Sequence, residues 1–198
     1  MKRVINLILI FVMISPLYAD FKVMGGFDLA KFKNHHLNSF QSSYKIGFLG
    51  GLGFEKKITQ NLLLEFDFFF MKKGSKAVSN DPPYLKSKYS LNVISIPVLL
   101  RYQFLYDNSP YIVAGIETSY ILSHTNKVKG EEAIDMKDLT DKSDFGYIFG
   151  GGYQIKLEEN LFFFIEARWH LGDRNLSMDV EGLVMHTDTI VIMVGIRS

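Results

Sequence analysis

The chain contains 198 residues, a length that corresponds to one domain with or without a leader segment. Cysteine is absent, which excludes disulfide bonds and cysteine-based zinc sites. The net charge is +1, whereas a nucleic-acid-binding protein is usually more basic. The 17 Phe and 10 Tyr residues favour β-strands and lipid boundaries.

Residues 1–19 have the pattern of a signal peptide. Lys2 and Arg3 precede a short apolar run, a proline ends that run, and Ala19 supplies a small residue at the cleavage point. We expect cleavage after Ala19, which leaves residues 20–198 as one β-barrel domain. An uncleaved membrane anchor is the alternative, but the apolar run is short for a helix that spans a bilayer.

Apolar and other side chains alternate with a period of two along most of the remaining chain. In residues 161–171 the odd positions are apolar, whereas even positions include Glu166, Arg168 and His170. Successive strand residues point to opposite faces, so this pattern predicts a strand with one apolar and one charged face. Each of eight such segments is near or above the ~9–11 residues that a tilted strand needs to cross a bilayer. The segments are residues 21–31, 44–55, 62–73, 89–104, 111–122, 144–156, 161–172 and 187–197.

The connections between these segments alternate between short and long. The short ones carry turn-forming residues such as Asp107-Asn108-Ser109-Pro110. The short connections are residues 56–61, 105–110 and 157–160, and the long ones are residues 32–43, 74–88, 123–143 and 173–186. An even strand number with tight turns at one end is typical of outer-membrane barrels. We therefore predict an all-β fold, an eight-stranded antiparallel up-and-down transmembrane β-barrel whose first and last strands pair.

The composition of the two strand faces indicates which one contacts lipid. In residues 62–70 one face is entirely Leu and Phe, whereas the other carries Glu65 and Asp67. Elsewhere the mixed face combines charged residues with glycines, which make room for long side chains in a narrow interior. We therefore predict that the uniform apolar face is outside. A soluble lipocalin-like barrel, with its apolar face inside, is the alternative.

The charged residues of the mixed faces form the main candidate site. They balance four cations against four anions, and charges away from water must pair. The residues are Lys45, Glu65, Asp67, Arg101, Glu117, Glu166, Arg168 and Arg197. An eight-stranded barrel is only wide enough for side chains to fill it, so we expect a structural salt-bridged plug. A proton or ion path is the alternative. Within the plug, Arg101 is expected to bridge Glu65 and Asp67.

No residue pattern indicates catalysis, a cofactor or a metal ion. The histidines have no metal-ligand spacing, and those in or beside the long connections are expected to be solvated. These histidines are His35, His36, His124 and His186. Ser123-His124-Thr125-Asn126 resembles the His-x-Ser-Asn stretch of lipid A 3-O-deacylase barrels, in which the histidine activates the serine. Asn126 occupies the position of that serine, so we predict no catalytic residue here.

Several stretches in the second half of the chain resemble the PorT-like outer-membrane β-barrel family. They occur in the family's order between residues 93 and 197. The stretches are Val93-Ile94-Ser95-Ile96-Pro97-Val98-Leu99-Leu100-Arg101-Tyr102-Gln103-Phe104, Pro110-Tyr111-Ile112-Val113-Ala114-Gly115, Phe149-Gly150-Gly151-Gly152-Tyr153, Phe164-Ile165-Glu166-Ala167-Arg168-Trp169 and Val194-Gly195-Ile196-Arg197. Ser95 and Ser198 depart from the family's pattern. The resemblance implies a barrel in a membrane, and it implies little about activity.

The sequence therefore predicts a non-enzymatic protein of the bacterial outer membrane with a closed lumen. We expect both termini on the periplasmic side, and a role in envelope structure or in binding through the long loops. The expected partners are outer-membrane lipid and the barrel-assembly machinery, with no nucleic acid, and the sequence names no loop ligand. A membrane-embedded lipid-modifying enzyme and a soluble secreted binder of an apolar ligand are the alternatives.

Overall fold

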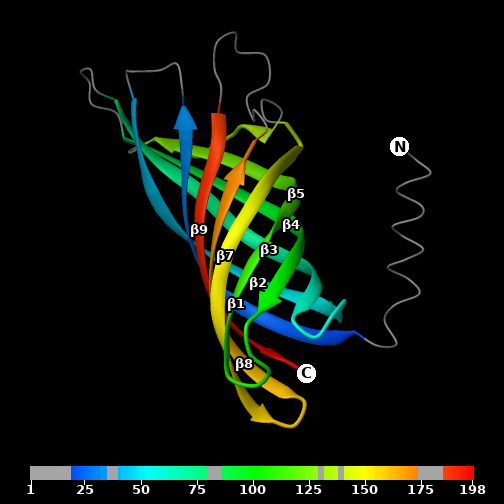
Figure 1. Ribbon diagram of the computed structural model, residues 1–198. Coiled ribbons are helices and arrows are strands. Elements are labelled where there is room, and N and C mark those ends of the chain that lie inside the picture. The colour runs from blue at the N-terminus through cyan, green and yellow to red at the C-terminus, as the bar shows by residue number, and fades with distance from the viewer. Residues whose placement is uncertain (1–18, 35–39, 80–85, 129–131, 138–140, 174–184) are drawn as a thin grey trace, which may run out of the picture.

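The computed structural model describes residues 19–34, 40–79, 86–128, 132–137, 141–173 and 185–198 (Figure 1). Most of these residues lie in β-strands. The strands are β1 (Asp20–Asn34), β2 (Phe40–Lys57), β3 (Leu62–Ser79), β4 (Lys86–Gln103), β5 (Ser109–Val128), β6 (Ile134–Asp135), β7 (Ser143–Glu158), β8 (Leu161–Gly172) and β9 (Met185–Arg197). Within the described residues, no helix is long and apolar enough to cross a membrane.

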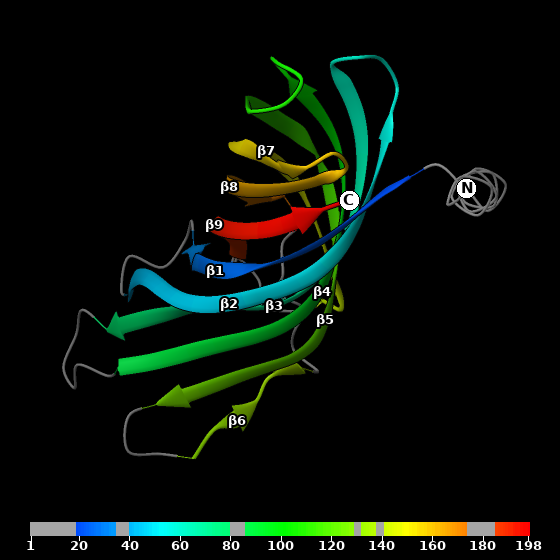
Figure 2. The same ribbon diagram turned by 90° about the horizontal axis from the view of Figure 1, so that it is seen from below.

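The strands form a closed antiparallel barrel. Their order is β4-β3-β2-β1-β9-β8-β7-β5, and β4 also pairs with β5, which closes a wall of eight strands. Seen from below, β8, β9, β1 and β2 lie side by side, although β1 and β9 are the first and last strands (Figure 2). The short β6 pairs only with Thr125 and Asn126 of β5, outside the barrel wall. The predicted eight-stranded barrel, with its first and last strands paired, is therefore confirmed.

Side chains alternate between the two faces of the wall. On β8, Ile165 and Trp169 are 49% and 46% exposed, whereas Glu166 and Arg168 are 2% and 1% exposed. Each of the other seven strands of the wall also places large apolar side chains outside. A water-soluble barrel has the opposite arrangement. The outer face is therefore the apolar one, and the soluble lipocalin-like alternative does not fit this structure.

Several strands continue beyond their predicted ends into the connections that were expected to be long loops. β3 reaches Ser79 and β5 reaches Val128, and β6 lies within the connection predicted as residues 123–143. Beyond an apolar band both faces of a strand meet water, so the backbone ladder continues without any hydrophobic alternation to reveal it. Residues 1–18 lie outside the described residues, so the signal peptide stays a prediction.

A β-bulge in β5 changes which side chains face the interior. The β4–β5 ladder shifts its register between Asn92 and Val93, which places one extra residue, Leu122, on β5. Before the bulge Ser119 and Ile121 point inward, and after it His124 does. Between the bulge and the end of β5 at Val128, the residues that would point outward in a regular strand therefore point inward, and the reverse. It turns Lys127 outward, where its side chain is exposed.

Glycines in the wall make room for charged side chains, as the sequence predicts. A Cβ at Gly53 would collide with Asp67 and Lys22, and a Cβ at Gly152 would collide with the Tyr111 hydroxyl. Gly50 has open space around its Cβ position. Glycine is therefore required at some wall positions because the interior is filled, and not because the backbone is strained there.

Candidate functional site

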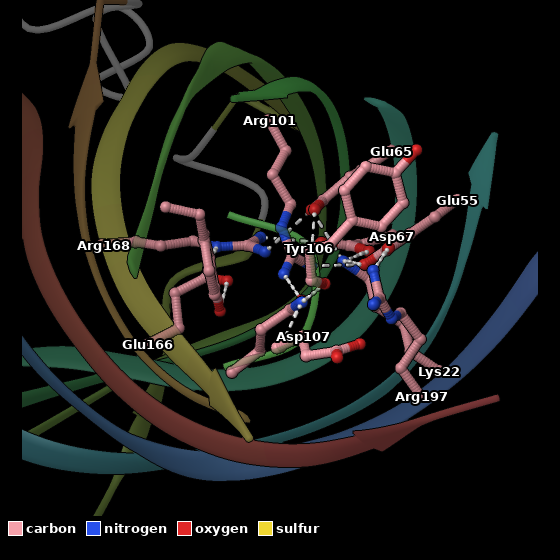
Figure 3. Close-up of polar contacts among 12 residues, drawn as sticks. Lys22, Glu55, Glu65, Asp67, Arg101, Tyr106, Asp107, Glu166, Arg168 and Arg197 are labelled. Carbon is pink, nitrogen blue, oxygen red and sulfur yellow. Dashed lines mark hydrogen bonds and ion pairs between the residues drawn. The ribbon is translucent and has the colours of Figure 1, made fainter. Parts of the chain in front are cut away.

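Eight charged side chains meet inside the barrel near the short turns (Figure 3). Four are cations and four are carboxylates, and each is at most 4% exposed. We call them the turn-side cluster, which consists of Lys22, Glu55, Glu65, Asp67, Arg101, Glu166, Arg168 and Arg197. They come from β1, β2, β3, β4, β8 and β9, so they join strands that are distant in sequence. The cluster has no net charge when all eight groups are ionised.

Arg101 contacts both neighbouring and distant strands. Its Nη1 atom lies 3.1 Å from Glu55 Oε1 and 3.5 Å from Glu65 Oε1. Its Nη2 atom donates a hydrogen bond to Gln154 Oε1, and its guanidinium carbon lies 3.6 Å from the centre of the Tyr111 ring. The prediction that Arg101 bridges two carboxylates holds for Glu65, but the second carboxylate is Glu55 and not Asp67.

Asp67 is bound by two other cations. Arg168 Nη1 lies 2.7 Å from Asp67 Oδ2, and Lys22 Nζ lies 2.9 Å from Asp67 Oδ1. Lys22 also lies 2.7 Å from Glu65 Oε2, and Arg168 Nε donates to Glu166. Each of these side chains thus has at least two oppositely charged neighbours or hydrogen-bonding groups, the condition under which buried charges are tolerated.

Lys22 and Glu55 belong to the cluster although they are not among the site residues predicted from the sequence. Glu55 Oε2 lies 2.8 Å from Arg197 Nη1, which closes the charge network between β2 and β9. Both missed residues lie near the ends of their strands, beside turn or terminal residues that are expected to be solvated. The alternation Phe21-Lys22-Val23 and Phe54-Glu55 was the available signal, because the exposed aromatic residue places its neighbour inside.

The β4–β5 turn folds beneath the cluster. Gln154 Nε2 donates to the backbone oxygens of Tyr106, at 3.2 Å, and Asp107, at 3.0 Å. Gln103 Nε2 donates to Tyr106 O at 2.8 Å. Between the turns and the cluster lies a pocket of about 490 Å³ whose lining reaches Leu63 and Arg197.

A second group of buried polar side chains lies farther along the barrel, towards the long loops. We call it the loop-side cluster, which consists of Asp28, Lys45, Lys73, Glu117, Asp144 and His170. Glu117 is its centre: its Oε1 lies 3.1 Å from Lys73 Nζ and its Oε2 lies 2.9 Å from His170 Nδ1. The predicted site residues Lys45 and Glu117 therefore belong here, and the other six predicted residues belong to the turn-side cluster.

A layer of apolar side chains lies between the two clusters on seven strands of the wall, but not on β8, where Arg168 and His170 are successive inward residues. Along the inner face of β3, Phe69 and Met71 stand between Asp67 and Lys73. Side chains from the other strands complete the layer with less than 5% exposure. These are Met24, Leu49, Leu99, Val113, Ile148, Val191 and Met193. The interior is thus filled by two polar clusters and by apolar side chains that lie between them except on β8.

The described residues contain no group of three or more His, Asp or Glu side chains placed to hold a metal ion. His124 does not lie in a solvated loop as predicted, because it is in β5 and only 4% exposed. His170 is buried against Glu117, and His186 is partly exposed in β9. His35 and His36 lie outside the described residues. Asn126 follows His124 on the inner side of the wall, and Thr125 points away from it.

A closed eight-stranded antiparallel barrel with an apolar outer face and a charged interior is a transmembrane β-barrel of the bacterial outer membrane. The family model of the outer membrane protein beta-barrel domain matches residues 14–174, and the chain belongs to that family. No curated protein matches the sequence.

Among solved structures that are similar to this chain, OprG has the same fold. The outer membrane protein OprG from Pseudomonas aeruginosa superposes with a TM-score of 0.58 at 13% identity, covering 91% of this chain and 95% of OprG. Ail from Yersinia pestis has a TM-score of 0.47 at 13% identity, with 91% and 99% covered. Neisserial surface protein A has a TM-score of 0.47 at 15% identity, with 89% and 95% covered.

Proposed function

We propose that this protein is a non-enzymatic, closed barrel that contributes to the structure of the outer membrane and presents its loops for binding. The observation that carries the proposal is the filled interior, in which buried charged and apolar side chains from all eight strands pack together. An ion would have to pass buried apolar side chains without hydration, which is costly. The turn-side cluster serves as an internal brace. The ion-path alternative would have to use the polar side chains of β8, where Arg168 and His170 are successive inward residues.

The position of His124 argues against the alternative of a lipid-modifying enzyme. Its side chain points into the barrel, whereas the acyl chains of a membrane lipid lie against the outer face. Asn126 offers an amide on the inner side and no hydroxyl nucleophile. The PorT-like branch of the family is part of this proposal and rests on the sequence stretches alone. The periplasmic position of the termini, which rests on the alternation of short and long connections, and the barrel-assembly machinery as a partner are also parts of this proposal.

Complementation of a deletion strain tests the non-enzymatic role. Loss of the gene should increase the sensitivity of the cells to detergent, and the parent chain should restore resistance. The variants His124→Ala and His170→Ala should restore it equally well when they assemble to normal levels, because neither histidine performs chemistry. Normal assembly without restored resistance in either variant would favour the enzyme. Lipid products released by purified parent protein, detected by mass spectrometry, would favour it as well.

A further inference from the structure

Three lysines lie side by side on the outer face of the barrel near the long loops. Lys76 of β3 is opposite Lys88 of β4, and Lys88 is opposite Lys127 of β5. All three side chains are exposed and point outward. Like charges directly opposite each other in a sheet are destabilising. The three ammonium groups therefore repel one another, and an anion of suitable shape bound between them would reduce this repulsion.

The lysine row has no anionic partner in the part of the chain that the structure describes. Ion pairs join other lysines to acids, such as Lys156 to Asp107, but none involves Lys76, Lys88 or Lys127. Lys86, the next outward-facing residue of β4, is also exposed and adds a fourth positive charge.

The row lines a groove. The groove has a volume of about 410 Å³, and its lining includes Lys76, Lys86, Lys88 and Lys127. Lys127 reaches it only because the β-bulge at Leu122 turns the end of β5 over. If the same residues formed a regular strand without the bulge, Lys127 would point into the barrel, so the bulge places this lysine in the positive surface.

The position of the row relative to the apolar band identifies its partner. Along the outer face of β3, Phe68 and Phe70 are exposed apolar residues and Lys72 follows them. Lys76 lies four positions beyond Lys72 in the sequence. For a strand tilted by about 40°, this corresponds to about 10 Å along the barrel axis. The exposed Tyr44 lies opposite Ser75 and marks the edge of the band beside the row. The lysines thus lie at the level of lipid headgroups and face sideways towards them.

We propose that Lys76, Lys88 and Lys127, together with Lys86, bind the phosphate groups of phosphorylated lipids in the outer leaflet. Phosphate oxygens match ammonium groups in charge, and several lysines near a membrane surface add their attraction to anionic headgroups. The outward direction of the side chains favours a lipid over a soluble polyanion, which would reach the barrel from above. This inference rests on the proposed periplasmic position of the termini, which places the long loops at the outer leaflet, and it is independent of whether the lumen is closed.

Proteoliposomes of defined composition test the proposal with the full barrel. The parent and the variant Lys76→Gln/Lys88→Gln/Lys127→Gln are reconstituted in phosphatidylcholine, alone or with bisphosphorylated or phosphate-free lipid A. Heat-modified gel mobility then gives the unfolding temperature. Bisphosphorylated lipid A should raise it for the parent and not for the triple variant, and phosphate-free lipid A should raise neither. In phosphatidylcholine alone, the triple variant should be at least as stable as the parent because the like-charge repulsion is gone.

A matched variant, Lys56→Gln/Lys57→Gln/Lys156→Gln, removes the same charge at the turn end and should keep the lipid A effect. In titrations with bisphosphorylated lipid A, the variant Lys76→Gln/Lys88→Gln/Lys127→Gln should bind about a hundredfold more weakly than the parent. The proposal would be overturned if bisphosphorylated lipid A raised the unfolding temperature equally in the parent and in Lys76→Gln/Lys88→Gln/Lys127→Gln. It would also be overturned if soluble heparin fragments stabilised the parent in phosphatidylcholine as much as bisphosphorylated lipid A does.

Discussion

Arg101 illustrates how one buried side chain is held by several partners. Its guanidinium contacts Glu55, Glu65 and Gln154 and stacks on the Tyr111 ring. Both carboxylates also contact other cations. When Arg101 is removed, Glu55 still contacts Arg197, and Glu65 still contacts Lys22. The network therefore shares each charge among partners, which limits the damage from any single substitution.

The variant Arg101→Met should lower the free energy of unfolding by about 3 kcal/mol, the lower part of the range for breaking a buried ion pair. The physical reason is that the four carboxylates of the turn-side cluster would then face only three cations. Adding Glu55→Gln restores the balance, so the double variant should be more stable than Arg101→Met alone. Urea unfolding in lipid vesicles measures both differences. If Arg101→Met unfolds like the parent, Arg101 is not a buried partner of these acids.

The sequence predicts which charged residues face the interior, but not which of them form ion pairs. The period-two pattern places Glu65, Arg101 and Arg168 inside, because each is flanked by residues of an uninterrupted apolar face. It does not predict that Asp67 pairs with Lys22 and Arg168 instead of Arg101. That pairing depends on how the strands are staggered around the barrel, and stagger is a property of the closed sheet and not of one strand.

At the scale of the strand, β2 shows how the wall is adapted to its contents. Gly53 lies on the inner face, where a Cβ would meet Asp67 and Lys22, whereas Gly50 has open space at the corresponding position. The same residue type thus has two different roles on one strand. The inward glycine provides volume for the charged cluster, and the outward one does not.

We expect Gly53→Ala to destabilise the barrel by about 1–3 kcal/mol, because the added methyl group overpacks a filled interior. Gly50→Ala is the matched control and should be neutral or slightly stabilising, since alanine reduces the conformational freedom of the unfolded chain. Parallel urea titrations of the two variants provide the comparison. Equal loss of stability in both would mean that backbone effects, and not side-chain volume inside the barrel, determine the need for glycine.

The strand ends and the bulge mark the limits of sequence-based prediction at this scale. All eight segments of the wall are predicted, but the ladder of β5 continues to Val128 through residues with no hydrophobic alternation. The bulge at Leu122 has no signal in the sequence, and it reverses the faces of His124 and Lys127. The buried histidine and the outward lysine row could therefore be recognised only from the pairing of neighbouring strands.

At the scale of the whole molecule, the barrel combines an apolar exterior with an interior that contains buried charged and apolar side chains. The turn-side cluster lies above the folded β4–β5 turn, the apolar layer lies above that cluster, and the loop-side cluster follows. Strands that are far apart in the chain meet in each layer. The contacts in the interior therefore join strands that are distant in the chain, and the closed lumen proposed above depends on the same side chains.

Ion conductance of the refolded monomer in a planar bilayer tests the closed lumen most directly. The parent protein should give no stable conductance steps, because hydrated ions cannot pass the buried layer that includes Phe69, Met71 and Ile148. A porin recorded in the same bilayers confirms that channels would be detected. Reproducible large conductance steps from monomeric parent protein would contradict the filled interior on which the proposed function rests.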